Sequence, residues 1–199
     1  MWLRSRSSSW LRPLLVASVM LHSVLAYESF IGSCPSVPSV EDFDMEKFAG
    51  TWYVVESFDE FRWCVTWNIT KGSDYGVWKL VESEESGVVY DLGLKHSNFY
   101  AAELSQPDTS NPGKLKIRWR LSISSSDFTV HSTDYNNYAG IFECQNMGLF
   151  HRQNGIVLSR KPGLKGAARQ LARIRTSDVK VEYFKPVRQY SCSNRPQEN

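Results

Sequence analysis

The sequence predicts an all-β domain, either a sandwich or a closed barrel, with one helix near its C-terminal end. Between Gly50 and Arg160, short β-rich segments alternate with turn residues about eight or nine times, which is typical of antiparallel sandwiches and barrels. The pattern changes only after Pro162-Gly163, where apolar residues begin to recur at helical spacing.

Residues 1–26 have the composition of a secretory signal peptide, which predicts a single mature domain over residues 27–199. Leu14–Leu25 is largely apolar but too short to span a membrane comfortably. Val24-Leu25-Ala26 fits a small-residue cleavage site. The basic start consists of Arg4, Arg6 and Arg12. A retained signal anchor is the alternative, and no later stretch is long and apolar enough for a transmembrane segment.

Removing the signal peptide changes the charge of the chain. The whole sequence carries 23 Lys and Arg against 21 Asp and Glu, a formal charge of +2. Residues 1–26 hold three Arg and no acid, so the mature balance is 23 − 3 = 20 basic against 21 acidic residues. A nearly neutral chain does not indicate a nucleic-acid partner.

An even number of cysteines behind an export signal predicts two disulfides. The four are Cys34, Cys64, Cys144 and Cys192. They form no Cys-x-x-Cys pair, so zinc and redox sites are not indicated, and their spacing leaves all three pairings open. His131 and His151 stand alone, without other metal-ligating residues, so we expect no metal site.

Asn68-Ile69-Thr70 is the usable N-glycosylation sequon, since Asn111 is followed by proline. A glycan at Asn68 must point outward. Strand alternation then places Cys64 and Thr66 outward as well. The inward set becomes Trp63, Val65, Trp67 and Ile69.

The expected strands run in order from the Gly50 turn to Arg160. They are Thr51–Phe58, Arg62–Lys71, Tyr75–Glu82, Val88–Lys95, Phe99–Leu104, Leu115–Leu121, Asp127–Ser132, Tyr138–Cys144 and Gly155–Arg160. In 115–121 the alternation is cleanest: Leu115, Ile117, Trp119 and Leu121 share one face, and Lys116, Arg118 and Arg120 the other. Such a pattern predicts a half-buried antiparallel strand.

An amphipathic helix follows the strands. Leu164, Ala168, Leu171 and Ala172 recur at helical spacing, which predicts about three turns lying against the outside of the sheet. We expect a last strand at Val179–Phe184, followed by a polar tail that carries Cys192.

Three segments resemble the motifs of the lipocalin family. They are Gly50-Thr51-Trp52-Tyr53, preceded by Phe43 and Phe48; Thr133-Asp134-Tyr135; and Leu158-Ser159-Arg160, just before the helix. The cysteine and turn layout is most similar to the apolipoprotein D and Lazarillo branch.

The resemblance implies an eight-stranded antiparallel up-and-down β-barrel, closed at one end, with one C-terminal α-helix packed outside. Trp52 would lie across the closed base and Arg160 would stack on it as a cation–π pair. The turn at Asp134 and Tyr135 would join two strands at the same end. The branch pairing implies the disulfides Cys34–Cys144 and Cys64–Cys192.

The inward rows predict a lining rich in aromatic residues and poor in charge. The expected ligand-binding residues are Val65, Trp67, Ile69, Ile117, Trp119, Leu121, Phe128, Val130, Tyr138, Phe142 and Ile156. A barrel of this size is either filled by side chains or holds one small ligand, and the resemblance favours a cavity.

Strict alternation from Trp52 places Glu56 on the pocket face, where an unpaired carboxylate would be costly. Either a β-bulge resets the phase at this point, or Glu56 meets a polar group of the ligand. We favour the bulge.

The function these features indicate is a secreted carrier of a small hydrophobic ligand, such as a lipid, fatty acid, sterol, retinoid or bilin, without catalytic residues or cofactor. Two alternatives remain. One is a scaffold that contacts a receptor or another protein through the acidic turn at Glu82, Glu84 and Glu85 or the loop at 106–113. The other is an enzyme with a free cysteine inside the barrel. The expectation that Cys64 points outward and is paired argues against this alternative. Contact with a membrane, a lipoprotein or a cell-surface receptor is left open.

Overall fold

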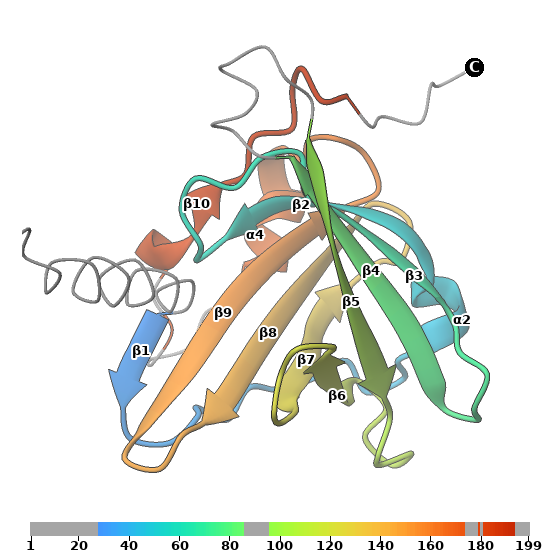
Figure 1. The fold of residues 1–199 in the computed structure, drawn as a ribbon, viewed down its shortest axis with the longest axis vertical. Helices are drawn as coiled ribbons and strands as arrows, with labels where there is room; N and C mark the ends of the chain where they lie inside the picture. Colours follow the sequence, from blue (N-terminus) through green and yellow to red (C-terminus); the bar gives the residue numbers. More distant parts are fainter. Residues whose placement is uncertain (1–27, 86–95, 174–178, 180, 194–199) are drawn as a thin grey trace, which may run out of the picture.

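The computed structural model describes residues 28–85, 96–173, 179 and 181–193, and its strands form one antiparallel sheet that closes into a barrel (Figure 1). Each strand from β2 to β9 pairs with the next, and β9 returns to pair with β2. The barrel strands are β2 (Gly50–Ser57), β3 (Thr66–Lys71), β4 (Val77–Glu85), β5 (Ser97–Ser105), β6 (Lys114–Trp119), β7 (Ser126–Thr133), β8 (Tyr138–Asn146) and β9 (Phe150–Ser159). The predicted eight-stranded barrel is confirmed.

Two predicted segments lie outside the described residues: the signal peptide and the strand at 88–95. The acidic residues Glu84 and Glu85, which we expected in a turn, belong to a strand instead. β4 continues to Glu85, which pairs with Ser97 of β5.

Two short strands extend the sheet beyond the barrel. β1 (Glu28–Ile31) pairs with the beginning of β9, and β10 (Lys185–Pro186) pairs with the end of β2. β9 therefore pairs with β1 over 150–153 and with β2 over 156–159. The strands β2 and β9 separate toward the open end of the barrel. We call the line along which they meet the seam; β1 lies beside it on β9, and β10 lies beside it on β2.

The helices are short. α2 (Met45–Phe48) closes one end of the barrel, and α4 (Gly166–Ala172) packs outside against β7, β8 and β9. α4 is shorter than the predicted three turns, and Leu171 is 58% exposed rather than inward. The strand expected at Val179–Phe184 is wrong, because a 3-10 turn, η1 (Val181–Tyr183), occupies this position before β10.

The sheet separates two apolar clusters. The inner cluster lies inside the barrel and contains Trp52, Trp67, Phe128 and Leu158. The outer cluster lies between the sheet, α4 and the terminal arms, and contains Phe58, Phe142 and Val157 among others. Neighbouring residues of β9 belong to different clusters, as the period-two geometry of a strand requires.

A glycine on β8 allows α4 to approach the sheet. A Cβ atom at Gly140 would lie 2.3 Å from the Ala172 carbonyl oxygen and 2.4 Å from His131 Cε1. Any larger residue would push the helix or the histidine away. Ser132 Oγ, on neighbouring β7, donates to the Leu171 carbonyl at 2.9 Å and holds the helix at this position.

Both disulfides pair as the resemblance implies: Cys34 with Cys144, and Cys64 with Cys192. The first attaches the N-terminal arm to β8 and the second attaches the C-terminal tail ahead of β3. Gln189 reinforces the tail, because its buried Nε2 donates to the carbonyl oxygens of Val54 (2.8 Å) and Val65 (2.7 Å).

Candidate ligand-binding site

The closed end of the barrel is built around Trp52 and Arg160. The Arg160 guanidinium carbon lies 3.7 Å from the centre of the Trp52 ring, and Trp52 is fully buried. Trp52 Nε1 donates to the Phe48 carbonyl at 2.8 Å, which attaches the indole to α2. The predicted cation–π pair is confirmed.

Arg160 also joins two separate segments, residues 47–51 and the turn at Tyr135, through their backbone carbonyls. It donates to Thr51 at 2.8 Å, to Ala49 at 2.9 Å and to Tyr135 at 3.0 Å, with further bonds to Lys47 and Phe48. These residues hold the end of the barrel together, so their role is structural.

The turn between β7 and β8 lies at the same end. Tyr135 has a positive φ of 63°, and Thr133 Oγ1 accepts from the Tyr135 backbone N–H at 2.9 Å. Asp134 accepts from the backbone N–H groups of Asn136, Asn137 and Tyr138. The Tyr135 hydroxyl in turn accepts from the Asp44 backbone N–H at 3.1 Å, which ties the turn to the start of α2.

Most of the expected lining residues lie in the inner cluster. They are Val65, Trp67, Ile69, Ile117, Phe128, Val130 and Ile156, each at most 3% exposed. Trp119 is half-buried and packs against the same cluster. The Trp67 and Phe128 rings, from opposite sides of the barrel, lie 6.1 Å apart between centroids.

Three expected lining residues lie elsewhere. Leu121 is 94% exposed, because β6 ends at Trp119 and the alternation no longer applies beyond it. Tyr138 and Phe142 point out of the barrel into the outer cluster. On β8 the inward residues are Ala139 and Ile141, which belong to the inner cluster.

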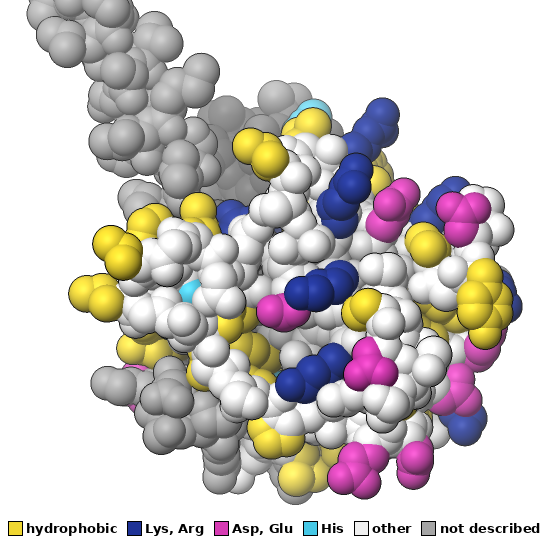
Figure 2. Space-filling model, turned by 90° about the horizontal axis from the view of Figure 1, so that it is seen from below, with side chains coloured by type: hydrophobic (Ala, Val, Ile, Leu, Met, Phe, Trp, Pro, Cys, Tyr) yellow, Lys and Arg dark blue, Asp and Glu magenta, His cyan; other side chains and the backbone are white. Residues whose placement is uncertain are grey.

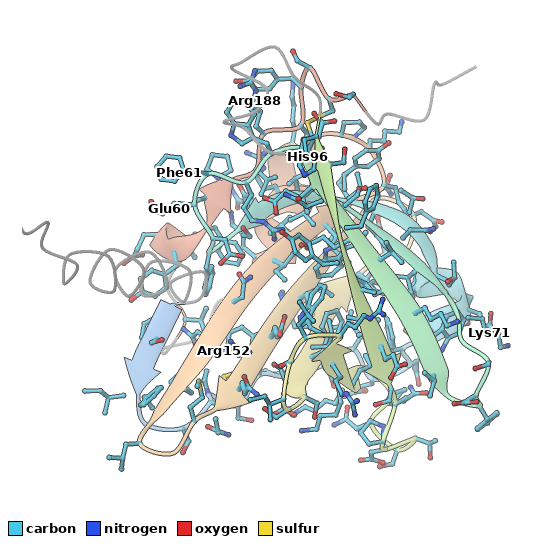
Figure 3. The ribbon with its side chains drawn as sticks, in the orientation of Figure 1. Glu60, Phe61, Lys71, His96, Arg152 and Arg188 are labelled. Atoms are coloured by element: carbon cyan, nitrogen blue, oxygen red, sulfur yellow. A yellow bond between two sulfur atoms is a disulfide. The ribbon has the colours of Figure 1, made fainter. Side chains whose placement is uncertain are left out.

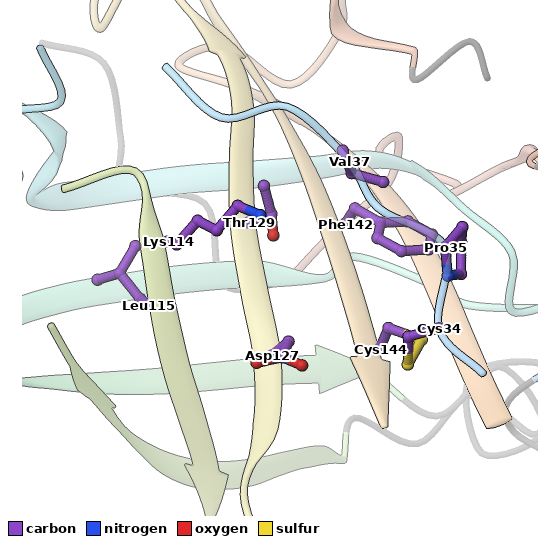
Figure 4. A pocket seen from close by; sticks show the side chains of 9 residues that line it. All are labelled: Cys34, Pro35, Val37, Lys114, Leu115, Asp127, Thr129, Phe142 and Cys144. Carbon is purple, nitrogen blue, oxygen red and sulfur yellow. A yellow bond between two sulfur atoms is a disulfide. The ribbon is translucent and has the colours of Figure 1, made fainter. Parts of the chain in front are cut away.

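Phe142 lines a groove on the outside of the barrel instead (Figure 4). The N-terminal arm, with Cys34, Pro35 and Val37, forms one wall, and residues of β6, β7 and β8 form the other. The groove encloses about 150 Å³ and includes the side chains of Lys114 and Asp127. It lies on the outer surface, next to the Cys34–Cys144 disulfide.

Glu56 does not face the interior. The pairing of β2 with β9 shifts by one residue between Val54 and Glu56, so that Glu56 lies opposite Val157 on the outer face. The predicted bulge is confirmed. Glu56 is 2% exposed and accepts hydrogen bonds from Arg173 Nε at 2.7 Å and Nη2 at 2.6 Å.

The open end of the interior is charged, which corrects the expectation of a lining poor in charge. Arg62, in the β2–β3 connection, reaches two carboxylates of β4: Nη2 lies 2.6 Å from Glu82 Oε1 and 3.1 Å from Glu84 Oε2. Trp67 Nε1 donates to the other Glu82 oxygen at 2.7 Å. The acidic turn proposed as a solvated contact surface is therefore largely a buried ion-pair network.

Asp59, Asn154 and Glu143 complete this open-end cluster with Arg62, Glu82 and Glu84. Asn154, on β9, donates from Nδ2 to Asp59 Oδ2 at 3.0 Å. Burial raises the pKa of Asp59 to about 6. Repulsion from Glu82 raises this pKa further, whereas the positive charge of Arg62 lowers it. Sequence reasoning missed these three residues, although Glu143 and Asn154 share the phase of the inward Ile141 and Ile156.

Glu143 is the most deeply buried acid of the cluster. It lies between Phe128 and Asn154 in the register of β7, β8 and β9, and it is 2% exposed. Burial raises its pKa to about 7, while a hydrogen bond with Ser126 and the charge of Arg152 act in the opposite direction. Arg152 lies on β9, toward the beginning of the strand (Figure 3).

The remaining predicted residues lie outside the barrel interior. Asn68 is exposed on β3, as a glycan requires, and glycosylation stays a prediction. His151 is buried beside β1, where its Nδ1 lies 2.9 Å from the Gly32 carbonyl oxygen. His131 is half-buried beside α4, where burial lowers its pKa to about 4. Among the described residues, no group of three His, Cys, Asp or Glu side chains is placed to hold a metal ion.

The face seen in Figure 2 carries charges of both signs. Lys and Arg side chains cross its middle, with acidic side chains between and beside them. Within the described part of the chain, no helix combines the length and apolar character that crossing a bilayer requires.

The chain is similar to known proteins over most of its length. Rabbit (Oryctolagus cuniculus) apolipoprotein D is 30% identical over 153 residues, which cover 74% of this chain and 77% of the relative. Bovine (Bos taurus) apolipoprotein D is 29% identical over 168 residues, covering 81% and 85%. The structure of insecticyanin from the tobacco hornworm Manduca sexta superposes with a TM-score of 0.61 at 20% identity, covering 80% of this chain and 88% of that one. No protein-family model matches the chain.

Proposed function

This chain belongs to the lipocalin family, and on that basis we propose that it is a secreted carrier that binds a small hydrophobic molecule inside the barrel. The observation that supports this most is the inward convergence of Trp67, Ile117 and Phe128 from separate strands, each at most 1% exposed. Apolar side chains that converge from separate strands offer a small molecule an environment without water.

Burial of apolar surface supplies the binding energy of such a carrier. Each methylene removed from water contributes about 0.8 kcal/mol. A ligand with about ten methylenes gains roughly 8 kcal/mol before the cost of immobilisation is subtracted. Affinities from sub-micromolar to tens of micromolar follow. Lipids, fatty acids, sterols, retinoids and bilins all satisfy this requirement.

The test is a titration with a panel of these ligands, followed by Trp fluorescence. We expect quenching by at least one member, because Trp52, Trp67 and Trp119 lie in or beside the inner cluster. If no member quenches the fluorescence or displaces another, the carrier function is wrong.

Two phenylalanines on neighbouring strands provide a matched pair of variants. Phe128 is 0% exposed and faces inward on β7, and Phe142 is 2% exposed and faces outward on β8. Both alanine variants should lose about 3–5 kcal/mol of stability. Only Phe128→Ala should change the affinity for the ligand. Equal effects on affinity would contradict binding inside the barrel.

The enzyme alternative required a free thiol, and all four cysteines of the sequence are paired. The scaffold alternative named two contact surfaces. In the acidic segment Glu82 and Glu85 are only 5% and 6% exposed, whereas the loop at 106–113 has exposed residues and stays open as a contact surface. The carrier proposal is therefore the one that the described side chains support best.

A further inference from the structure

We propose that the open end of the barrel binds a protonated amine, so that the preferred ligand has a positively charged N–H head and an apolar body, with Glu143 and Asp59 as the acceptors. This inference rests on the proposed carrier function. It names the chemical class of the ligand, which that proposal leaves open.

The placement of Glu143 is the first reason. Its cross-strand neighbours are Phe128, in the inner cluster, and Asn154, which hydrogen-bonds Asp59. Directly paired residues of antiparallel strands point to the same face, so the Glu143 carboxylate points into the barrel. The side chain is 2% exposed, and its Oε1 is buried without a hydrogen-bond partner. The indole Nε1 of Trp119 is likewise buried and unpaired, and it is near enough to lower the pKa of Glu143 without completing a hydrogen bond to it. A buried polar atom without a partner costs about 1–3 kcal/mol, which a donor on the ligand would recover.

Asp59 offers a second acceptor of the same kind. Its Oδ2 accepts from Asn154 at 3.0 Å and lies 3.7 Å from Arg62 Nη1. Its Oδ1 is buried without a hydrogen-bond partner. The charge of Asp59 also raises the pKa of Glu143, so the two carboxylates are near enough to repel each other. A single cation between them would relieve this repulsion and meet both free oxygens.

The charge balance around these acceptors favours a cation over an anion. Four carboxylates belong to this part of the described structure, namely Asp59, Glu82, Glu84 and Glu143. Two guanidinium groups, Arg62 and Arg152, stand against them. Arg62 is already engaged by Asp59, Glu82 and Glu84. The carboxylate of a fatty acid would add a fifth acidic group to this environment, whereas an ammonium group would favour the ionised form of the acids already present.

The surroundings of Glu143 also fix the orientation of the ligand. Phe128, directly beside Glu143, contacts the ring of Trp67, and both belong to the inner cluster that continues to the closed end. The charged head would therefore stay at the open end, and the apolar body would point toward Trp52. Because the free oxygens accept hydrogen bonds, the head must carry N–H donors and not charge alone.

The experiment compares four ligands that share one alkyl chain: dodecylamine, dodecyltrimethylammonium, dodecanol and dodecanoic acid, each titrated below its micelle concentration and followed by Trp fluorescence. Wild-type protein should bind dodecylamine at least tenfold more tightly than the other three. The variants Glu143→Gln and Asp59→Asn should each reduce this preference by tenfold or more and leave dodecanol unaffected. Glu103→Gln, an exposed carboxylate on β5, is the control and should change nothing.

Each outcome decides one question. If none of the four ligands binds, the carrier function itself fails. If dodecanol or dodecanoic acid binds as well as dodecylamine, the carrier function stands and the amine proposal is overturned. The same holds if both carboxylate variants keep the wild-type preference. Circular dichroism establishes that each variant is folded, and the wild-type comparison decides the matter even if one variant does not fold.

Discussion

The Glu56 carboxylate receives two hydrogen bonds from the Arg173 guanidinium, at 2.7 Å from Nε to Oε2 and 2.6 Å from Nη2 to Oε1. The hydrogen bond to Glu56 raises the pKa of Arg173. The pair joins the bulge of β2 to the residue that follows α4. The bulge and the docking of the helix therefore depend on each other.

Replacing Arg173 alone should destabilise the protein more than replacing both Glu56 and Arg173. Among the described residues, Arg173→Ala leaves the buried Glu56 carboxylate with Arg169, whose Nε lies 3.5 Å away. We expect a loss of about 3 kcal/mol in the free energy of unfolding, measured with urea. The double variant Glu56→Leu with Arg173→Leu should recover much of it. The exposed pair Lys71–Glu46, beside α2 (Figure 3), is the control, and Glu46→Ala should cost less than about 1 kcal/mol. Equal losses at both sites would contradict this account.

Arg160→Lys should weaken the closed end although the charge is retained. Lysine cannot reach the five carbonyl groups that the guanidinium binds, and it loses the planar stack on Trp52. We expect a loss of about 2–4 kcal/mol in the free energy of unfolding. Arg118→Lys, on the exposed face of β6, should be neutral. If Arg160→Lys lowers the free energy of unfolding by less than about 1 kcal/mol, the contacts of the guanidinium with the carbonyl groups and with Trp52 contribute little to stability.

The raised pKa of Glu143 predicts how stability depends on pH. The unfolded chain releases this proton near the ordinary pKa of 4.5, whereas the folded protein keeps it up to a pKa of about 7. Between these values the folded state binds more protons, so stability falls as pH rises. The total loss in the free energy of unfolding that is due to Glu143 is on the order of 3 kcal/mol, and it does not increase further above pH 7. Asp59 acts in the same direction between 3.8 and about 6.

The measurement is the free energy of unfolding of wild type and Glu143→Gln from pH 4.5 to 7.5. The variant should gain stability relative to wild type as pH rises. A difference between the two proteins that does not change with pH would show that Glu143 titrates normally.

The two disulfides should contribute similar amounts to stability. They close loops with sequence separations of 110 and 128 residues, and the chain-entropy model assigns about 4–5 kcal/mol to each. Removal of either pair by double alanine substitution should lower Tm by roughly 10–20 °C. Thermal unfolding followed by circular dichroism compares the two variants directly. An unchanged Tm in one variant would mean that its arm is held by other contacts, such as those of Gln189.

Export and glycosylation make a separate prediction. Secreted protein from animal cells should begin at Tyr27, and enzymatic removal of N-glycans should increase its gel mobility. Asn68→Gln should abolish this increase, since Asn68 is exposed on the outer face of β3. N-terminal sequencing and gel electrophoresis test both points, and a product that retains residues 1–26 would instead indicate a signal anchor.

Sequence patterns predicted the all-β domain and most of its inner face, because alternation is unambiguous where one face is polar, as on β6. The closed barrel, as opposed to a sandwich, followed from the resemblance to lipocalins. On β8 both faces are apolar: Ile141 is buried inside and Phe142 outside. Alternation alone cannot tell these faces apart. Cys144 shares the phase of Phe142 and is joined to the N-terminal arm outside the barrel, which would have given the correct assignment.

The open-end cluster could not be predicted because its partners are distant in sequence. Arg62 and Glu82 are 20 residues apart, and Asp59 and Asn154 are 95 apart. Local composition suggested a solvated acidic turn at Glu82 and Glu84, since charged residues are rarely buried without partners. Only the barrel brings the partner, Arg62, to these side chains.

At the seam, residues 150–153 of β9 are paired on one side by only the four residues of β1. Loss of β1 by proteolysis would leave this length of β9 as an open sheet edge, whose free N–H and C=O groups can accept a strand from another molecule. The N-terminal arm thus covers a sheet edge that could otherwise pair with another molecule, and the Cys34–Cys144 bond, three residues beyond β1, holds the arm to β8.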